Sequence, residues 1–100
     1  MIYNIEIKEE AREDILQATL WYSDKAPDLH LKFINQLEIT LESIQSNPKA
    51  YKKVYKTFRQ AALNKFPYVV LYESNENTII IFSVFHSSQH PRKKLHRLRK

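Results

Sequence analysis

Basic and aromatic residues are interleaved after residue 48 in a pattern that could bind a polyanion. Bases on strands can contact phosphates while aromatic rings stack on nucleobases, which favours RNA or single-strand binding. In the alternative interpretation the aromatic residues pack internally and the lysines only solvate a hairpin. We name Lys52, Lys53, Arg92 and Lys93 as candidates for binding nucleic acid or another target. The bases concerned are Lys49, Lys52, Lys53, Lys56, Arg59 and Lys65, with Tyr51, Tyr55 and Phe58 among them.

His86 is the residue best suited to acid–base chemistry, because an imidazole titrates near neutral pH. It ends a long apolar run, so it is either a general acid or a packing residue at the end of a strand. His90 would share a helix face with His86, but Pro91 and the lack of neighbouring Asp, Glu or Cys argue against a metal site. We therefore expect neither a metal nor a cofactor.

The composition excludes several classes of protein. With 100 residues, 43% of them apolar, the chain is expected to form a single domain over residues 1–100. It contains no cysteine and no glycine. This excludes disulfides, thiolate catalysis, cysteine zinc sites, glycine-rich phosphate loops and the nucleophile elbow of serine hydrolases. Neither a membrane-length apolar run nor a secretion signal is visible, so a cytoplasmic location is expected.

Charge is divided unequally along the chain. Residues 1–48 hold nine acids and four bases, a net charge of −5, whereas residues 49–100 hold two acids and twelve bases, a net charge of +10. This asymmetry indicates a basic face that meets a polyanion or an acidic protein. The acids of the first half are predicted on the outer faces of helices, where they could not form the carboxylate pair of a glycosidase.

The first half of the chain is predicted to form a short strand and two helices. Residues 2–7 are typical of a strand, and the period then changes to that of a helix from Glu9. Ala26-Pro27 ends the first helix, Asp28 is the expected N-cap of the second, and Asn47-Pro48 ends that one. The two should form an antiparallel α-hairpin. Their expected buried stripes are Ala11, Ile15, Ala18 and Tyr22, widened by Leu16 and Trp21, and Phe33, Leu37, Leu41 and Ile44, with Ile34 beside them.

The second half is predicted to form four strands, at residues 51–56, 58–63, 67–73 and 78–86. Asn64-Lys65 and residues 74–77 form turns, in which asparagine is the expected residue at positive φ. The fold class is therefore α+β: an N-terminal strand, an α-hairpin, and a mainly antiparallel sheet with the helices on one face. Residues 87–100 form a basic tail in which Leu95 and Leu98 alone can pack.

Strict alternation predicts that the last two strands are apolar on both faces. Ile79, Ile81 and Phe85 would share one face of the final strand, and Ile80, Phe82 and Val84 the other. One face can pack against the helices. The other needs a cover from a C-terminal helix, a second copy or a partner.

The order of these features resembles that of the RelE/ParE superfamily, toxins of type II toxin–antitoxin systems also grouped as plasmid stabilisation proteins. The resemblance covers residues 1 to about 92, and its fold is a small antiparallel sheet carrying an α-hairpin. It rests on Ala11-x-x-Asp14-Ile15, Trp21-Tyr22, Phe33, Leu37, Ile44-x-x-Asn47-Pro48-x-x-Tyr51, Arg59, Phe66-Pro67-Tyr68-Val69-Val70-Leu71-Tyr72, Ile80-Ile81-Phe82-Ser83-Val84-Phe85-His86 and Pro91.

The resemblance implies neutralisation by an acidic cognate antitoxin and an action on nucleic-acid machinery. RelE-like members are endoribonucleases that cut mRNA on the ribosome, whereas ParE-like members poison DNA gyrase. In an RNA-cleaving enzyme, Arg59 and Lys56 would hold the phosphate, and His86 would protonate the leaving 5′-oxygen.

Two features common in the nuclease branch are missing. No arginine lies between His86 and Pro91, and the C-terminus has no tryptophan or tyrosine. Together with the long helix pair, this favours gyrase over mRNA as the target. A basic RNA- or DNA-binding module without toxicity, or an inactivated toxin that serves as a scaffold, is the alternative function.

Overall fold

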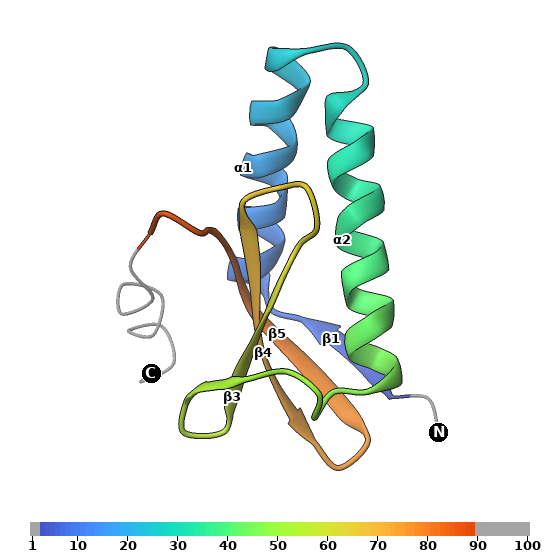
Figure 1. Cartoon of the computed structure of the whole chain (residues 1–100), viewed down its shortest axis with the longest axis vertical. Helices are drawn as coiled ribbons and strands as arrows, with labels where there is room; N and C mark the ends of the chain where they lie inside the picture. The colour runs from blue at the N-terminus through green and yellow to red at the C-terminus, as the bar shows by residue number, and fades with distance from the viewer. Residues whose placement is uncertain (1–2, 90–100) are drawn as a thin grey trace.

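Two antiparallel helices lie side by side against one face of a sheet (Figure 1). The computed structural model of the chain describes residues 3–89. In this part the sheet has five strands in the order β1-β5-β4-β3-β2, and only β1 and β5 run parallel. The predicted α+β fold is confirmed. The elements are β1 (Asn4–Ile7), α1 (Glu9–Lys25), α2 (Leu29–Ser46), β2 (Lys53–Tyr55), β3 (Phe58–Ala62), β4 (Tyr68–Asn75) and β5 (Thr78–His86).

Helix α1 packs closely on the sheet because its contact side chains are small. Ala11 and Ala18 are buried, and Tyr22 extends the contact by packing its ring 5.3 Å from that of Phe33 on α2. The prediction that Leu16 and Trp21 widen this face is wrong, since both side chains are more than half exposed. Leu16 is rotated by about 140° from Ala11, because successive helical residues turn by about 100°.

Helix α2 begins where the sequence predicted, but the Asp28 side chain does not cap it. Asp28 occupies the N-cap position, yet its φ of 63° is left-handed and its side chain makes no capping hydrogen bond. The expected stripe is present, with Phe33, Leu37 and Ile44 buried in the core. Within residues 3–89, neither helix is long and apolar enough to cross a membrane.

The position of a residue in its turn, and not asparagine chemistry, decides where φ is positive. Lys56 and Glu76, the first residues of the two-residue loops before β3 and β5, have φ values of 49° and 52°. Hairpins of this length favour primed turns, in which the first loop residue has positive φ. Lys65, and not Asn64, takes the same conformation before β4. The expectation that asparagine would fill these positions is therefore wrong.

Strand β5 contains a bulge that was not predicted. Leu71 of β4 pairs with Ser83, and the next residue, Tyr72, pairs with Ile81. Phe82 is therefore an extra residue between the two pairs. Such an insertion reverses the alternation of side chains along the rest of the strand.

The bulge corrects the predicted assignment of faces. Val84, and not Phe85, joins Ile79 and Ile81 in the core beneath the helices. Phe85 lies in a separate cluster on the opposite face. His86 follows Val84 by two residues, so the bulge also turns His86 toward the helix side of the sheet.

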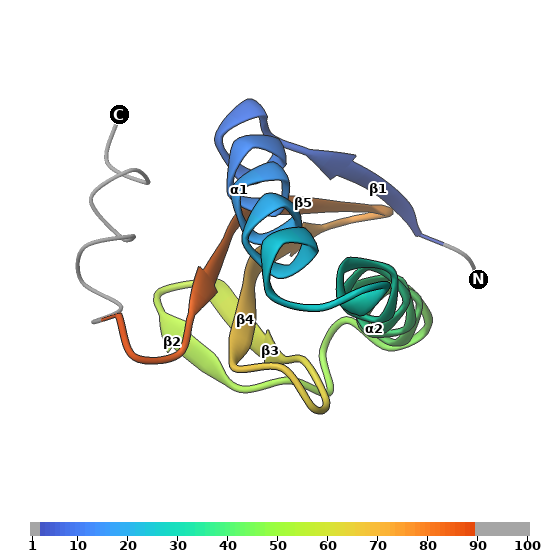
Figure 2. The ribbon, with the colours of Figure 1, turned by 90° about the horizontal axis from the view of Figure 1, so that it is seen from above.

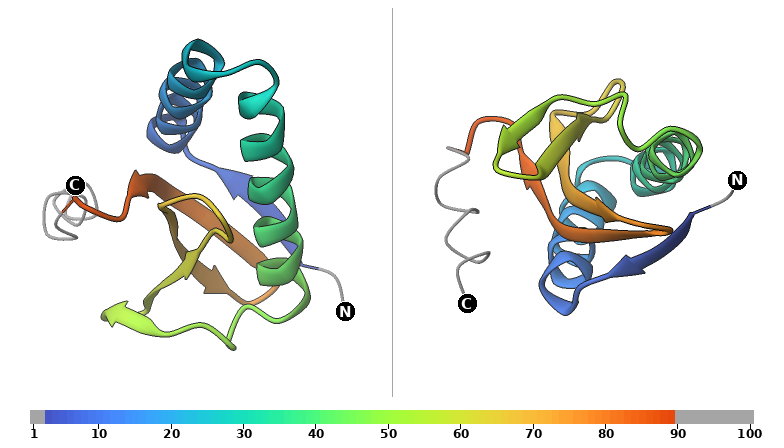
Figure 3. Two further views of the ribbon diagram at one scale, coloured as in Figure 1. Left: turned by 45° about the horizontal axis from the view of Figure 1, so that its top comes forward. Right: turned by 90° about the horizontal axis from the view of Figure 1, so that it is seen from below.

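The second face of the sheet is partly covered by the chain itself. Val69, Leu71 and Phe85 are buried there, and Val54 and Phe58 pack against them. Seen from above, β3 and β2 curve away from the plane of β5 and β1 (Figure 2), and Figure 3 shows the curvature from two more sides. The expectation that this face depends on an external cover therefore does not hold for the Val69–Leu71–Phe85 cluster.

Asp14 of α1 fixes the bulged part of β5. One of its carboxylate oxygens, Oδ2, accepts hydrogen bonds from the Ser83 hydroxyl at 3.0 Å and from the Val84 amide at 3.1 Å. The prediction that Asp14 lies on the outer face of its helix is therefore wrong. It follows Ala11 by three residues and precedes Ala18 by four, a spacing that already places it beside the buried stripe.

Replacing Asp14 with alanine is expected to lower the free energy of unfolding by about 2–3 kcal/mol. The variant leaves the Val84 amide and the buried Ser83 hydroxyl without this acceptor, and an unsatisfied buried donor costs about 1–3 kcal/mol. Urea unfolding of the full chain measures the change. The control Glu42→Ala removes an exposed mid-helix carboxylate and should change stability by less than about 0.5 kcal/mol. Equal losses in the two variants would contradict the assignment.

Candidate functional site

A cationic surface lies on the β2–β3 hairpin and the segment before it. Lys49, Lys52, Lys53 and Lys56 are all exposed. Their side chains are therefore available to a negatively charged partner. Lys56 Nζ lies 5.3 Å from the ring centre of Tyr55, so one cation is placed over an aromatic face. We call these four lysines the basic hairpin.

The aromatic residues beside the basic hairpin are only partly available for stacking on a nucleobase. Tyr55 and Phe58 stack on each other with ring centres 6.3 Å apart, and both are half-buried. The Phe58 ring also makes an edge contact with Phe82 at 5.1 Å. Phe58 therefore contributes to the core of the second face, whereas the neighbouring lysines face solvent.

Arg59 is engaged in the fold. Its guanidinium Nη1 donates a hydrogen bond to the Tyr51 carbonyl oxygen at 2.6 Å. The hydroxyl of Tyr72, which is completely buried, donates to the Pro48 carbonyl oxygen, also at 2.6 Å. The Tyr51 hydroxyl in turn lies 2.6 Å from the Ser43 hydroxyl. These bonds attach the connection between α2 and β2 to the sheet, and we call them the 48–51 latch.

His86 lies at the other end of the sheet's helix face. Its Nδ1 accepts a hydrogen bond from the Ser88 amide at 3.0 Å. The same atom lies 2.7 Å from the Ser88 hydroxyl oxygen. Because an amide can only donate, this geometry requires an unprotonated Nδ1 and places the imidazole proton on Nε2. The ring also packs edge-on against Tyr68 at 5.3 Å.

Lys56 lies in the turn before β3 and Arg59 lies on β3, so both belong to the β2–β3 hairpin. The structure does not bring Arg59 and His86 together. Arg59 pairs with Tyr72 of β4, and His86 pairs with Tyr68 of the same strand. The partners are four residues apart, so the two side chains start roughly 13 Å apart along the strand, with β4 between them. One phosphate group is too small to bridge that separation.

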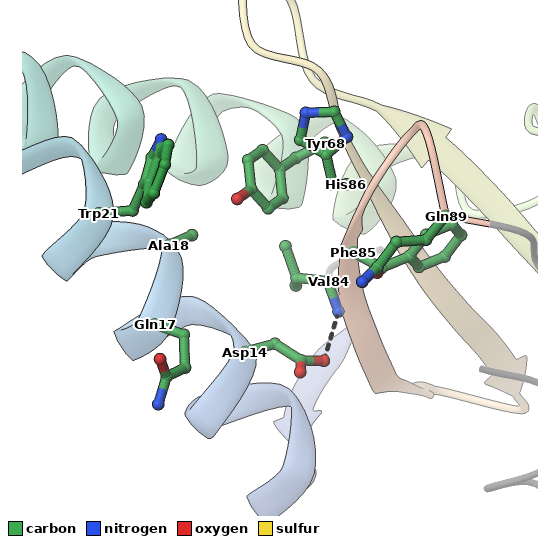
Figure 4. A pocket seen from close by; sticks show the side chains of 9 residues that line it. All are labelled: Asp14, Gln17, Ala18, Trp21, Tyr68, Val84, Phe85, His86 and Gln89. Atoms are coloured by element: carbon green, nitrogen blue, oxygen red, sulfur yellow. Dashed lines mark hydrogen bonds between the residues drawn. The ribbon is translucent and has the colours of Figure 1, made fainter. Parts of the chain in front are cut away.

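His86 instead contributes to an open cleft of about 280 Å³ between α1 and the end of β5 (Figure 4). Trp21 and Tyr68 form aromatic walls, and Gln17 and Gln89 contribute amide groups. Burial raises the pKa of the Tyr68 hydroxyl, so it remains a neutral donor at physiological pH. The remaining lining residues are Asp14, Ala18, Val84 and Phe85.

The cleft is not predicted from the sequence. Trp21 was assigned to the core, and strict alternation would have turned His86 to the other face. The spacing of Ala18, Trp21 and Asp14 on α1 could have indicated one helix side, but nothing in the sequence announced the bulge at Phe82. Neither Trp21 nor Tyr68 is among the site residues predicted from the sequence.

Three sequence candidates cannot be placed in the site. Arg92, Lys93 and the second histidine of the rejected metal pair, His90, lie outside the described residues. Among residues 3–89, no group of three His, Cys, Asp or Glu side chains could hold a metal ion.

The comparisons with known proteins agree with the architecture. A structure described as "Chromosomal ParDE TA system from P. aeruginosa" superimposes with a TM-score of 0.74 and covers 85% of this chain and 96% of that chain. The two sequences are 16% identical. At this identity the likeness shows that the two proteins share a fold.

The sequence matches identify the family. Residues 5–91 match the family described as "ParE toxin of type II toxin-antitoxin system, parDE". The "Toxin ParE2" proteins of two Mycobacterium tuberculosis strains are each 26% identical over 92 residues, covering 91% of this chain and 88% of the relative. The chain therefore belongs to the ParE toxin family, which confirms the predicted superfamily.

The 48–51 latch predicts a loss of stability at alkaline pH. Burial raises the pKa of Tyr72 to about 12, against a lowering effect of the Arg59 charge. In the unfolded chain a tyrosine ionises near pH ~10, so between these values the unfolded state binds fewer protons and stability falls by about 1.4 kcal/mol per pH unit. Below pH ~10 this contribution is constant.

Urea unfolding between pH 8 and pH 11.5 tests the latch through the difference between variants. Tyr72→Phe should lower stability at pH 8 by about 1–3 kcal/mol, because the Pro48 carbonyl loses its donor, and should flatten the alkaline decline. Tyr55→Phe is the control and should retain the wild-type slope. If the free energy of unfolding falls as steeply with pH in Tyr72→Phe as in the wild type, the Tyr72 hydroxyl does not cause the alkaline decline.

Proposed function

We propose that this chain is the toxin of a ParDE pair, that a cognate acidic antitoxin binds and neutralises it, and that the free toxin acts on DNA gyrase. Membership of the ParE family supports the toxin class. The charge of +10 on residues 49–100 supports an acidic partner. The choice of gyrase over ribosome-bound mRNA rests on the geometry of Arg59 and His86.

Cleavage of RNA imposes a strict geometric requirement. The 2′-hydroxyl must attack the phosphorus in line, cations must hold the same phosphate, and an acid must protonate the leaving 5′-oxygen. A general acid must come within about 3 Å of the atom that it protonates. Arg59 and His86 are separated by β4, and the Arg59 guanidinium already donates to the Tyr51 carbonyl. This arrangement favours a toxin that acts by binding its target over a toxin that acts by cutting RNA.

The basic hairpin is the surface that we propose for the target. Lys52 and Lys53 are exposed on it, and Lys56 lies at its turn. Gyrase acts while bound to DNA, so a cationic hairpin can contact the enzyme's acidic surface or the phosphates of the bound DNA. We assign Arg92 and Lys93 to the same role as a proposal from their charge.

An assay with purified gyrase, supercoiled plasmid and the full chain tests the target. We expect broken DNA attached to gyrase, unchanged with His86→Ala and reduced severalfold with Lys52→Glu/Lys53→Glu. The control Lys32→Glu reverses an exposed charge on α2 and should leave the yield unchanged. Mapping of transcript ends after induction in cells should reveal no new cuts.

The opposite result would establish the nuclease. Cut messages without gyrase adducts, with a loss of about 10²–10⁴ in rate for His86→Ala, would assign general-acid catalysis to that residue. If neither adducts nor cuts accompany binding to nucleic acid, the chain is a non-toxic binding module. If it binds only the antitoxin, it is an inactivated scaffold.

Thermal unfolding in the presence of the antitoxin tests the proposed partner. The acidic product of an adjacent reading frame, present at about 100 times its Kd, should stabilise the toxin by about 2.7 kcal/mol. For a chain of this length that corresponds to a rise in Tm on the order of 10 °C. An acidic antitoxin from an unrelated pair serves as the control. A Tm that does not respond to the cognate protein would remove the proposed partner.

A further inference from the structure

A pocket distinct from the cleft of Figure 4 lies between helix α2 and the turn that joins β3 to β4. Its volume is about 410 Å³. It shares no lining residue with the cleft and contains none of the lysines of the basic hairpin. We call it the α2–turn pocket, and it is lined by Leu29, Lys32, Asn35, Gln36, Lys65 and Phe66.

The helix side of the α2–turn pocket is one surface of α2. Leu29, Lys32 and Gln36 follow one another at spacings of three and four residues, so their side chains share a side of the helix. Phe33 and Leu37 are buried in the core. The rotation of α2 about its axis is therefore fixed by packing, and with it the surface that α2 turns toward the pocket.

Hydrogen bonds and ring contacts hold the turn side of the pocket in place. The Leu63 amide donates to the Tyr68 carbonyl oxygen at 2.9 Å, and the Tyr68 amide donates to the Phe66 carbonyl oxygen at 2.8 Å. The centre of the Phe66 ring lies 5.0 Å from that of Tyr22 and 5.6 Å from that of Phe33, in edge contacts. Phe66 is therefore anchored in the core, and the rest of its half-buried surface lines the pocket.

The lining combines apolar surface with positive charge. Leu29 and Phe66 are half-buried, whereas Lys32 from α2 and Lys65 from the turn are exposed. In the part of the chain that the structure describes, neither lysine forms an ion pair, and no acid lines the pocket. The two carboxamide side chains of the lining can donate further hydrogen bonds to an oxyanion.

We propose that the α2–turn pocket binds a small aromatic anion, which is a ring that carries a carboxylate or a phosphate. The ring packs against Phe66, since aromatic pairs gain more than the burial of their area alone. The anionic group lies between Lys32 and Lys65, because two cations from different elements raise the local positive potential. Pockets for small molecules have volumes of about 300–1,000 Å³ and combine apolar walls with a few polar groups.

The extent of the positive charge favours a small anion over a nucleic acid. A protein that binds a nucleic acid neutralises several successive phosphates, whereas two lysines line this pocket. The basic hairpin cannot extend the pair, because Lys56 precedes β3 and Lys65 follows it, so the two lie at opposite ends of that strand. The proposal therefore does not depend on the identity of the toxin's target.

Titration of the full chain with 2-naphthoate, followed by two-dimensional NMR of the amide groups, tests the proposal. We expect the largest shifts at the backbone amides of Leu29, Lys65 and Phe66 and at the side-chain amides of Asn35 and Gln36. A ligand of this size should saturate the site with a Kd on the order of 1 mM. Neutral 2-naphthamide should bind severalfold more weakly. 2-Naphthyl phosphate should shift the same signals, and the tighter of the two anions identifies the anionic group that the site takes.

Variants with fewer charges separate this site from general attraction to a basic protein. Lys32→Gln/Lys65→Gln should raise the Kd for 2-naphthoate severalfold and should keep the wild-type Tm, because both side chains are exposed. Lys49→Gln/Lys52→Gln removes the same charge from the basic hairpin and should leave that Kd unchanged. The proposal is overturned if 2-naphthamide binds as tightly as 2-naphthoate, or if the Kd is unchanged in Lys32→Gln/Lys65→Gln. Shifts that centre on the basic hairpin, or that grow without saturation, would overturn it as well.

Discussion

The Asp14 carboxylate is the interaction on which the arrangement of this molecule depends. It accepts from Ser83 and Val84 at the bulge in β5, so a side chain of α1 holds the irregular backbone of the strand. A charged acceptor makes stronger hydrogen bonds than a neutral one, and the two donors compensate the partial burial of the carboxylate. The position of α1 and the register of β5 are thereby fixed together.

Several distant features follow from that register. Because Phe82 is the extra residue, Val84 enters the core, Phe85 turns to the second face, and His86 reaches the cleft beside α1. Without the bulge, His86 would face the side of the sheet covered by Val54 and Phe58. The cleft and the second hydrophobic cluster are therefore two consequences of one inserted residue.

The sequence predicted what depends on periodicity and missed what depends on packing between elements. The helix pair, the strands and the fold class follow from apolar spacing and from breaks such as Pro27 and Pro48. The bulge leaves no such signal, because residues 79–85 are apolar on both parities apart from Ser83. Trp21 was misplaced since an apolar residue near a buried stripe does not reveal where the sheet ends. The left-handed Lys56 and Glu76 were missed because loop length overrides residue preference.

The candidate site shows how residue type and order can agree with a chemistry that the register does not support. Arg59 and His86 occur in the order expected for an RNA-cleaving toxin, yet they pair with β4 residues four positions apart. Arg59 anchors the connection that carries Lys49 and Lys52, so in the function that we propose its contribution is to position those cations. A basic surface attached to the sheet by the 48–51 latch suits the proposed recognition of a large anionic partner, which requires no proton transfer. The geometry that weakens the nuclease interpretation is thus the same geometry that orders the basic hairpin.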